Sequence, residues 1–144
     1  TVSENVAYDV SGYCYYLEDG VEEENTFSFN LGAYVHMIGD SVPTGGGQNT
    51  EKYTTNTNAT LPADVTAAAF YITNVRNNLI GNAASGGWAG FAFPNLPEPV
   101  GAHKSDNPTM NPSYVLPLDI IGNSAHSTAY WWYHTGAFYF GGDL

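Results

Sequence analysis

One short phrase returns four times and decides the fold: VAYDVSG (residues 6–12), TFSFNLGA (26–33), LIGNAAS (79–85) and IIGNSAHS (120–127). Aligned on a polar residue, the four copies place Asp9, Asn30, Asn82 and Asn123 at one position, 21, 52 and 41 residues apart. A small residue stands two places later in each copy, and a second strand-like run follows (CYYL, AYVHMI, GFAF and YWWYH). A repeat of about twenty residues that carries strands and no helix predicts a β-solenoid.

The composition agrees with an all-β domain. The chain has 144 residues, of which 43% are hydrophobic and 15% aromatic, and it contains 16 Gly. This length fits a single domain, residues 1–144, with a sizeable core. The chain lacks extended stretches with helical periodicity, so we expect a parallel β-helix of about six coils.

In such a helix, equivalent residues of successive coils stack along the axis. The four aligned residues Asp9, Asn30, Asn82 and Asn123 should then form a ladder, because an Asn amide both donates and accepts hydrogen bonds. We interpret this ladder as structural, with no part in chemistry.

Two long stretches interrupt the repeats and are predicted to be loops outside the coils. The stretch 39–62 is polar and contains Asn58-Ala59-Thr60, an acceptor pattern for N-glycosylation. The stretch 94–117 is rich in proline, which removes backbone donors. The chain begins at Thr1, inside what looks like an ongoing repeat. We therefore expect a piece of a larger extracellular or cell-surface protein.

The charge balance excludes one large class of partner. The net charge is −11, with only three basic residues. A nucleic-acid-binding protein needs a basic surface to neutralise phosphates, so nucleic acid is excluded as a partner. No run of apolar residues is long enough to span a bilayer, so we expect no membrane insertion by this segment.

Acidic residues gather around Gly20. Glu18, Asp19 and Glu22 are hard oxygen ligands that could hold Ca²⁺, and paired carboxylates could also serve as acid and base in a glycosidase. The third interpretation is a solvated turn whose Asp-Gly pair supplies the bend. The spacing matches no known calcium loop, and we expect no other cofactor.

Clustered aromatic residues are the clearest sign of a binding surface. Side chains along a strand point alternately to opposite faces, so some of these rings should reach the surface. Such rings suit the apolar faces of sugars. The candidate glycan-binding residues are Tyr13, Tyr15, Tyr16, Trp131, Trp132 and Tyr133. Cover by the stretch 94–117 is the alternative.

Three blocks of sequence carry a resemblance to a known family. ENVAYDVSGYCYYLEDGVEEENTFSFNLG, AAFYITNVRNNLIGNAASGGWAGFAF and IIGNSAHS resemble, in order and spacing, the right-handed parallel β-helix of the fibrocystin and cell-surface hyaluronidase group, which includes a hyaluronan-binding protein linked to cell migration. The resemblance implies this fold over most of residues 4–128. It also implies a polysaccharide-cleaving activity for some relatives, which commonly carry His where Tyr13 stands here.

We therefore predict an extracellular structural or adhesive module without catalytic residues, which binds neutral glycan or other copies of itself. The alternative is a polysaccharide-cleaving enzyme of the hyaluronidase type. An open β-helix end exposes unpaired backbone, so another copy or a neighbouring β-helix domain is expected against the ends.

Overall fold

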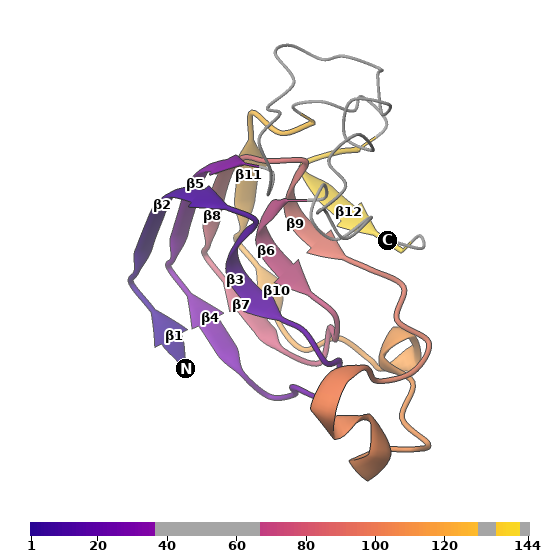
Figure 1. Cartoon of the computed structure of the whole chain (residues 1–144). Helices are drawn as coiled ribbons and strands as arrows, with labels where there is room; N and C mark the ends of the chain where they lie inside the picture. The colour runs from indigo at the N-terminus through magenta and orange to yellow at the C-terminus, as the bar shows by residue number, and fades with distance from the viewer. Residues whose placement is uncertain (37–66, 130–134, 142–144) are drawn as a thin grey trace, which may run out of the picture.

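The computed structural model describes residues 1–36, 67–129 and 135–141, which wind as a parallel β-helix with three sheets (Figure 1). Sheet A contains β1 (Val2–Ser3), β4 (Thr26–Ser28), β7 (Asn78–Ile80) and β10 (Ile120–Ile121). Sheet B contains β2 (Val6–Ser11), β5 (Leu31–His36), β8 (Ala83–Gly86) and β11 (Ser124–His126). Sheet C contains β3 (Tyr13–Leu17), β6 (Ala68–Ile72), β9 (Ala89–Phe93) and β12 (Phe138–Phe140).

Each coil contributes one strand to each sheet, and neighbouring strands pair in parallel. Coil 1 consists of β1–β3, coil 2 of β4–β6, coil 3 of β7–β9 and coil 4 of β10–β12. The all-β, parallel architecture follows the sequence prediction. The expected count of about six coils is not confirmed, since the described residues form four coils.

The corner between sheets A and B has the same backbone in every coil. The residue before the corner Asn is left-handed each time: Glu4 (φ 58°), Phe29 (57°), Gly81 (63°) and Gly122 (68°). A left-handed residue turns the chain sharply, and glycine adopts this conformation without steric cost. Coils 3 and 4 therefore use the favoured residue, whereas coils 1 and 2 tolerate strain.

An asparagine ladder closes this corner. Asn30 Nδ2 donates to Asn82 Oδ1 at 3.0 Å, and Asn82 Nδ2 donates to Asn123 Oδ1 at 3.0 Å. The predicted first member, Asp9, was wrong: Asn5 takes that place and donates to Asn30 Oδ1 at 3.1 Å. The interval from coil 1 to coil 2 is therefore 25 residues, not 21. Asp9 lies in β2, on the face that carries exposed side chains.

Small residues let sheets B and C approach each other inside the coil. A Cβ atom on Gly32 would lie 2.7 Å from Ala69 Cβ and 3.3 Å from the Cys14 side chain. One on Gly90 would lie 3.0 Å from Ala84 Cβ. Contacts this short leave no room for a larger side chain, which explains the small residue two places after each ladder Asn.

Aromatic rings fill the wider part of the interior. Successive strands of sheet C stack four rings with centroids 4.5–4.7 Å apart: Tyr15, Phe70, Phe91 and Phe138. The planes of the rings in each of the three pairs are nearly parallel, with interplanar angles of 13°, 7° and 1°. Phe70 and Phe91 are fully buried, so this stack is the centre of the core.

The proline-rich stretch leaves the coil between β9 and β10 and folds back along the outside (Figure 1). It contains two short 3-10 helices, η2 (Gly101–Asp106) and η3 (Pro112–Tyr114). Val100 N donates to Asp19 O at 3.0 Å, so a segment that follows coil 3 contacts coil 1. It packs on the acidic turn of coil 1.

Candidate ligand-binding surface

The aromatic residues chosen from the sequence divide between the interior and the surface. Tyr15 was wrong as a glycan-binding residue, because it is only 9% exposed. Its hydroxyl lies 3.2 Å from Asn5 O and 3.3 Å from Leu31 O, to which it donates. The predicted residues Trp131, Trp132, Tyr133 and Asn58 lie outside the described residues.

Tyr13 and Tyr16 form a cluster with Tyr71. The rings of Tyr13 and Tyr16 are stacked at 4.8 Å, and Tyr71 lies 4.6 Å from Tyr13. Burial, together with Glu18, Tyr71 and Asp19, raises the pKa of Tyr16 to about 12, so its hydroxyl stays protonated. Tyr16 is 42% exposed and Tyr71 is buried, so within this cluster Tyr16 reaches the surface.

The acidic turn is organised by its own backbone. The Glu22 carboxylate accepts hydrogen bonds from the N–H groups of Glu18, Asp19 and Gly20, at 3.2, 3.0 and 2.9 Å. A carboxylate with three such donors closes a turn and has few lone pairs left for an ion. Among the residues that the structure describes, no group of three or more His, Cys, Asp or Glu is arranged to hold a metal ion. The geometry therefore favours the turn interpretation.

Cys14 lies inside the coil beside Gly32. Burial raises the pKa of its thiol to about 11, so the side chain is neutral at physiological pH. A neutral, partly buried thiol is a poor nucleophile, and Cys14 acts as a small apolar residue.

A pair of exposed aromatic side chains lies elsewhere, on the outer face of sheet B in coils 1 and 2. Tyr8 is 67% exposed and Tyr34 55% exposed, and their rings are stacked at 5.8 Å. Val6 and Leu31 are exposed beside them. We call these four side chains, together with Asp9 and His36, the sheet B surface. In coils 3 and 4 the same face carries Ser85, Ser124 and His126.

A backbone irregularity shapes this surface. Asp9 and Tyr34 lie at equivalent places between the pairs Tyr8–Ala33 and Val10–Val35. Both are left-handed, with φ of 60° and 56°. The register shifts at Tyr34 where β5 meets β8, so coil 3 lacks the extra residue. Bulges of this kind redirect side chains, and a left-handed Tyr costs of order 1–2 kcal/mol. The fold thus tolerates strain where the aromatic surface forms.

Polar groups border the aromatic pair. His36 Nε2 lies 2.7 Å from Asp9 Oδ1, and the His36 ring meets the Tyr34 ring edge-on at 4.2 Å. Stacked rings beside a carboxylate and an imidazole can hold the apolar face of a sugar while bonding its hydroxyl groups. Sequence reasoning missed this surface. The signal was an alternative alignment of ENVAYDV (residues 4–10) with FNLGAYV (29–35), which pairs Asn5 with Asn30.

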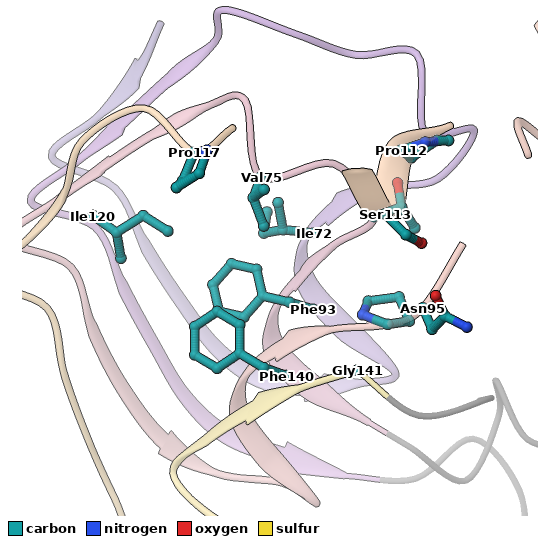
Figure 2. Close-up of a pocket in the computed structure, with 12 residues that line it drawn as sticks. Ile72, Val75, Phe93, Asn95, Pro112, Ser113, Pro117, Ile120, Phe140 and Gly141 are labelled. Atoms are coloured by element: carbon teal, nitrogen blue, oxygen red, sulfur yellow. The ribbon is translucent and has the colours of Figure 1, made fainter. Parts of the chain in front are cut away.

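A cavity of about 470 Å³ lies at the corner where the proline-rich stretch departs from the coil (Figure 2). Its lining is mainly apolar, including Ile72, Val75, Phe93, Ile120 and Phe140. The polar side chains in its lining are Thr73, Asn95 and Ser113. Among the described residues that line it, none is acidic, basic or a histidine.

None of the helices in the described residues has the length and hydrophobicity of a membrane span.

Comparison with known proteins gives a family match over most of the chain. The model of a family described as CEMIP beta-helix matches residues 1–131. Similar proteins of Dictyostelium discoideum are Protein rliB, 54% identical over 144 residues, and Communication mutant protein F, 52% identical over 149 residues. Both matches cover all of this chain and 13% of the relative, so the chain spans a small part of those proteins.

A more distant match extends beyond that organism. Fibrocystin-L of Mus musculus is 33% identical over 86 residues, which is 60% of this chain and 2% of that protein. No solved structure matches the chain.

Proposed function

Because this chain belongs to the CEMIP β-helix family, we propose that it is a non-catalytic extracellular module that binds neutral glycan through the sheet B surface. The observation that carries the proposal is the exposed, stacked pair of Tyr8 and Tyr34. Two large rings exposed side by side on a sheet face offer a surface on which a sugar ring can stack. The strained backbone of Tyr34 supports a functional interpretation, because such strain clusters at functional sites.

The electrostatics favour a neutral ligand. The chain has a net charge of −11, and Asp9 lies on the surface itself. A polyanion such as hyaluronan would meet repulsion over this face. A neutral sugar would meet no such repulsion, and its stacking on the rings and its hydrogen bonds to Asp9 and His36 require no ligand charge.

Affinity electrophoresis in gels that contain laminarin, mannan or dextran tests the proposal. We expect at least one of these neutral polysaccharides to retard the chain, and hyaluronan to have no such effect. Tyr8→Ala and Tyr34→Ala should each weaken binding by about 1–3 kcal/mol. Tyr114→Ala is the matched control, since Tyr114 is 86% exposed but lies on η3, away from sheet B. The proposal would be refuted if the chain migrated equally fast with and without each neutral polysaccharide. It would also be refuted if Tyr114→Ala weakened binding as much as Tyr8→Ala does.

One observation keeps the enzyme as a second candidate. Asp9 and His36 bring an acid and a base together at 2.7 Å on the same face as the tyrosines. However, the Asp9 side chain is 61% exposed, and neither Asp9 nor His36 lines the cavity of about 470 Å³. Viscometry of hyaluronan solutions decides between the candidates. We expect no loss of viscosity, whereas depolymerisation that His36→Gln and Asp9→Asn both abolish would establish the enzyme.

A further inference from the structure

Phe29 is an exposed aromatic residue at the A–B corner of coil 2, directly before the ladder residue Asn30. The residue is 63% exposed, and its backbone is left-handed with φ of 57°. Coils 3 and 4 have Gly81 and Gly122 at this place, and glycine adopts the conformation without steric cost. The corner can therefore form without a phenylalanine, and the ring of Phe29 lies outside the core.

The next coil makes room for this ring. A Cβ atom on Gly81 would lie 2.7 Å from Phe29 Cε1 and 2.8 Å from Phe29 Cδ1. A glycine in coil 3 thus allows the Phe29 ring to lie against the backbone of that coil. This contact restrains the ring, while the rest of its surface faces solvent. A restrained ring loses little conformational freedom when a ligand stacks on it.

Phe29 extends the sheet B surface into an apolar strip that follows coil 2. The exposed or partly exposed side chains along this strip are Phe29, Leu31, Ala33 and Tyr34. On coil 1, Val6 pairs with Leu31 and Tyr8 pairs with Ala33, because β5 lies between β2 and β8 (Figure 1). Strands rise about 3.3 Å per residue and neighbouring coils lie about 4.8 Å apart, so the strip is roughly 16 Å long and roughly 10 Å wide.

The size and the charge of the apolar strip indicate the class of ligand. Its area of roughly 160 Å² is several-fold smaller than the surface of about 800 Å² that each partner buries in a standard protein–protein interface. A linear sugar polymer needs only a narrow strip, because its rings follow one another along the chain and can stack in turn. Exposed carboxylates border both ends, Glu4 in the coil before Phe29 and Asp9 beside Tyr34, so an anionic polymer is disfavoured.

We propose that Phe29 is a second subsite of the sheet B surface, and that the ligand is a linear neutral polysaccharide bound along coil 2 over several consecutive sugars. One sugar stacks at Tyr8 and Tyr34, and a sugar further along the polymer stacks on Phe29. A single sugar contacts only one of these positions. The inference rests on the proposed function, because it extends the same surface.

Affinity electrophoresis of Phe29→Gly in the same laminarin, mannan and dextran gels tests the proposal. The variant should bind the retarding polysaccharide about tenfold more weakly, because one aromatic subsite is lost. Glycine is the residue that coils 3 and 4 have at this corner, so the fold should persist, which circular dichroism verifies. Phe29→Tyr keeps an aromatic ring and should bind like the unaltered chain. Glu4→Gly is the matched control, since it makes the same backbone change at the corner of coil 1 and removes no ring, and it should leave binding unchanged.

Oligosaccharides of defined length, made from laminarin, mannan and dextran, distinguish a second subsite from a structural effect of the substitution. Hexasaccharides should compete with the retarding polysaccharide more strongly than disaccharides do, and Phe29→Gly should reduce this advantage about tenfold without weakening the disaccharides. An unchanged advantage in Phe29→Gly would overturn the second subsite. Binding that is weakened by Tyr8→Ala but not by Phe29→Gly would do the same and leave the proposed function standing, whereas retardation by none of the three polysaccharides would overturn both.

Discussion

Glu4 adopts at the A–B corner of coil 1 the left-handed backbone that glycine adopts in coils 3 and 4. Its side chain is exposed, so it makes no buried contact that would offset the cost of the strained backbone. Asn5 follows directly and begins the ladder, which explains why the corner keeps its shape without glycine. The ladder bonds thus hold a backbone conformation that the local sequence disfavours.

Replacing Glu4 by Gly should stabilise the chain by about 1 kcal/mol, because the left-handed conformation no longer meets a Cβ atom. Gly122→Ala is the reverse experiment. A Cβ at Gly122 would lie 3.9 Å from its nearest neighbours, so its cost of about 1 kcal/mol is conformational alone. Urea unfolding measures both changes. A destabilised Glu4→Gly variant would show that the Glu4 side chain has a role that its exposure conceals.

At the scale of elements, the proline-rich stretch acts as a clasp from coil 3 to coil 1. Its Leu96 and Pro112 pack directly on Gly20, where a Cβ atom would lie 2.6 and 2.7 Å from their side chains. Asp19 O accepts from Val100 N in the same region. The acidic turn of coil 1 thus has a structural role, because the proline-rich stretch packs against it.

Gly20→Ala should displace the clasp and expose the stretch 94–117 to proteases. Gly141→Ala is a matched control, since Gly20 and Gly141 have φ of +82° and +81° and a Cβ at Gly141 would meet nothing within 4 Å. The two variants share the same backbone cost, so any difference between them reports packing against Leu96 and Pro112. Limited proteolysis followed by mass spectrometry should find early cleavage in 94–117 for Gly20→Ala only. Identical digestion of the two variants would contradict a clasp.

At the scale of the whole molecule, the β-helix presents separate faces for separate tasks. The sheet B surface carries exposed tyrosines, and the C–A corner carries the clasp. A ligand on the sheet B surface therefore does not meet the clasp.

An extracellular location makes a prediction for the chain as the cell produces it. Asn58-Ala59-Thr60 should carry an N-linked glycan when the chain is secreted from a eukaryotic cell. Treatment with an N-glycosidase should lower the mass of the secreted chain, and Asn58→Gln should abolish that change. Secreted material whose mass already equals that of the polypeptide would show that the acceptor is not used.

Much of the fold could be predicted from the repeat alone. The Asn residues at 30, 82 and 123, each followed by a small residue, determined a coil with a tight corner and a narrow interior. These features can be predicted locally, because the corner geometry and the size of the interior follow from the type of residue at each position.

Which side chains face outward was decided by the tertiary structure. Asp9 and Tyr34 each add an extra residue, so coils 1 and 2 keep one register, whereas β5 shifts against β8 at Tyr34. A shift of one residue in a strand exchanges inside for outside, so a small error in alignment moves every candidate. The sequence alignment placed Asp9 in the ladder, but Asn5 holds that place. It also left open which tyrosines face outward, and the structure buries Tyr15 and exposes Tyr8. Packing against neighbouring coils selects between such registers, and that information lies in contacts between residues distant along the chain.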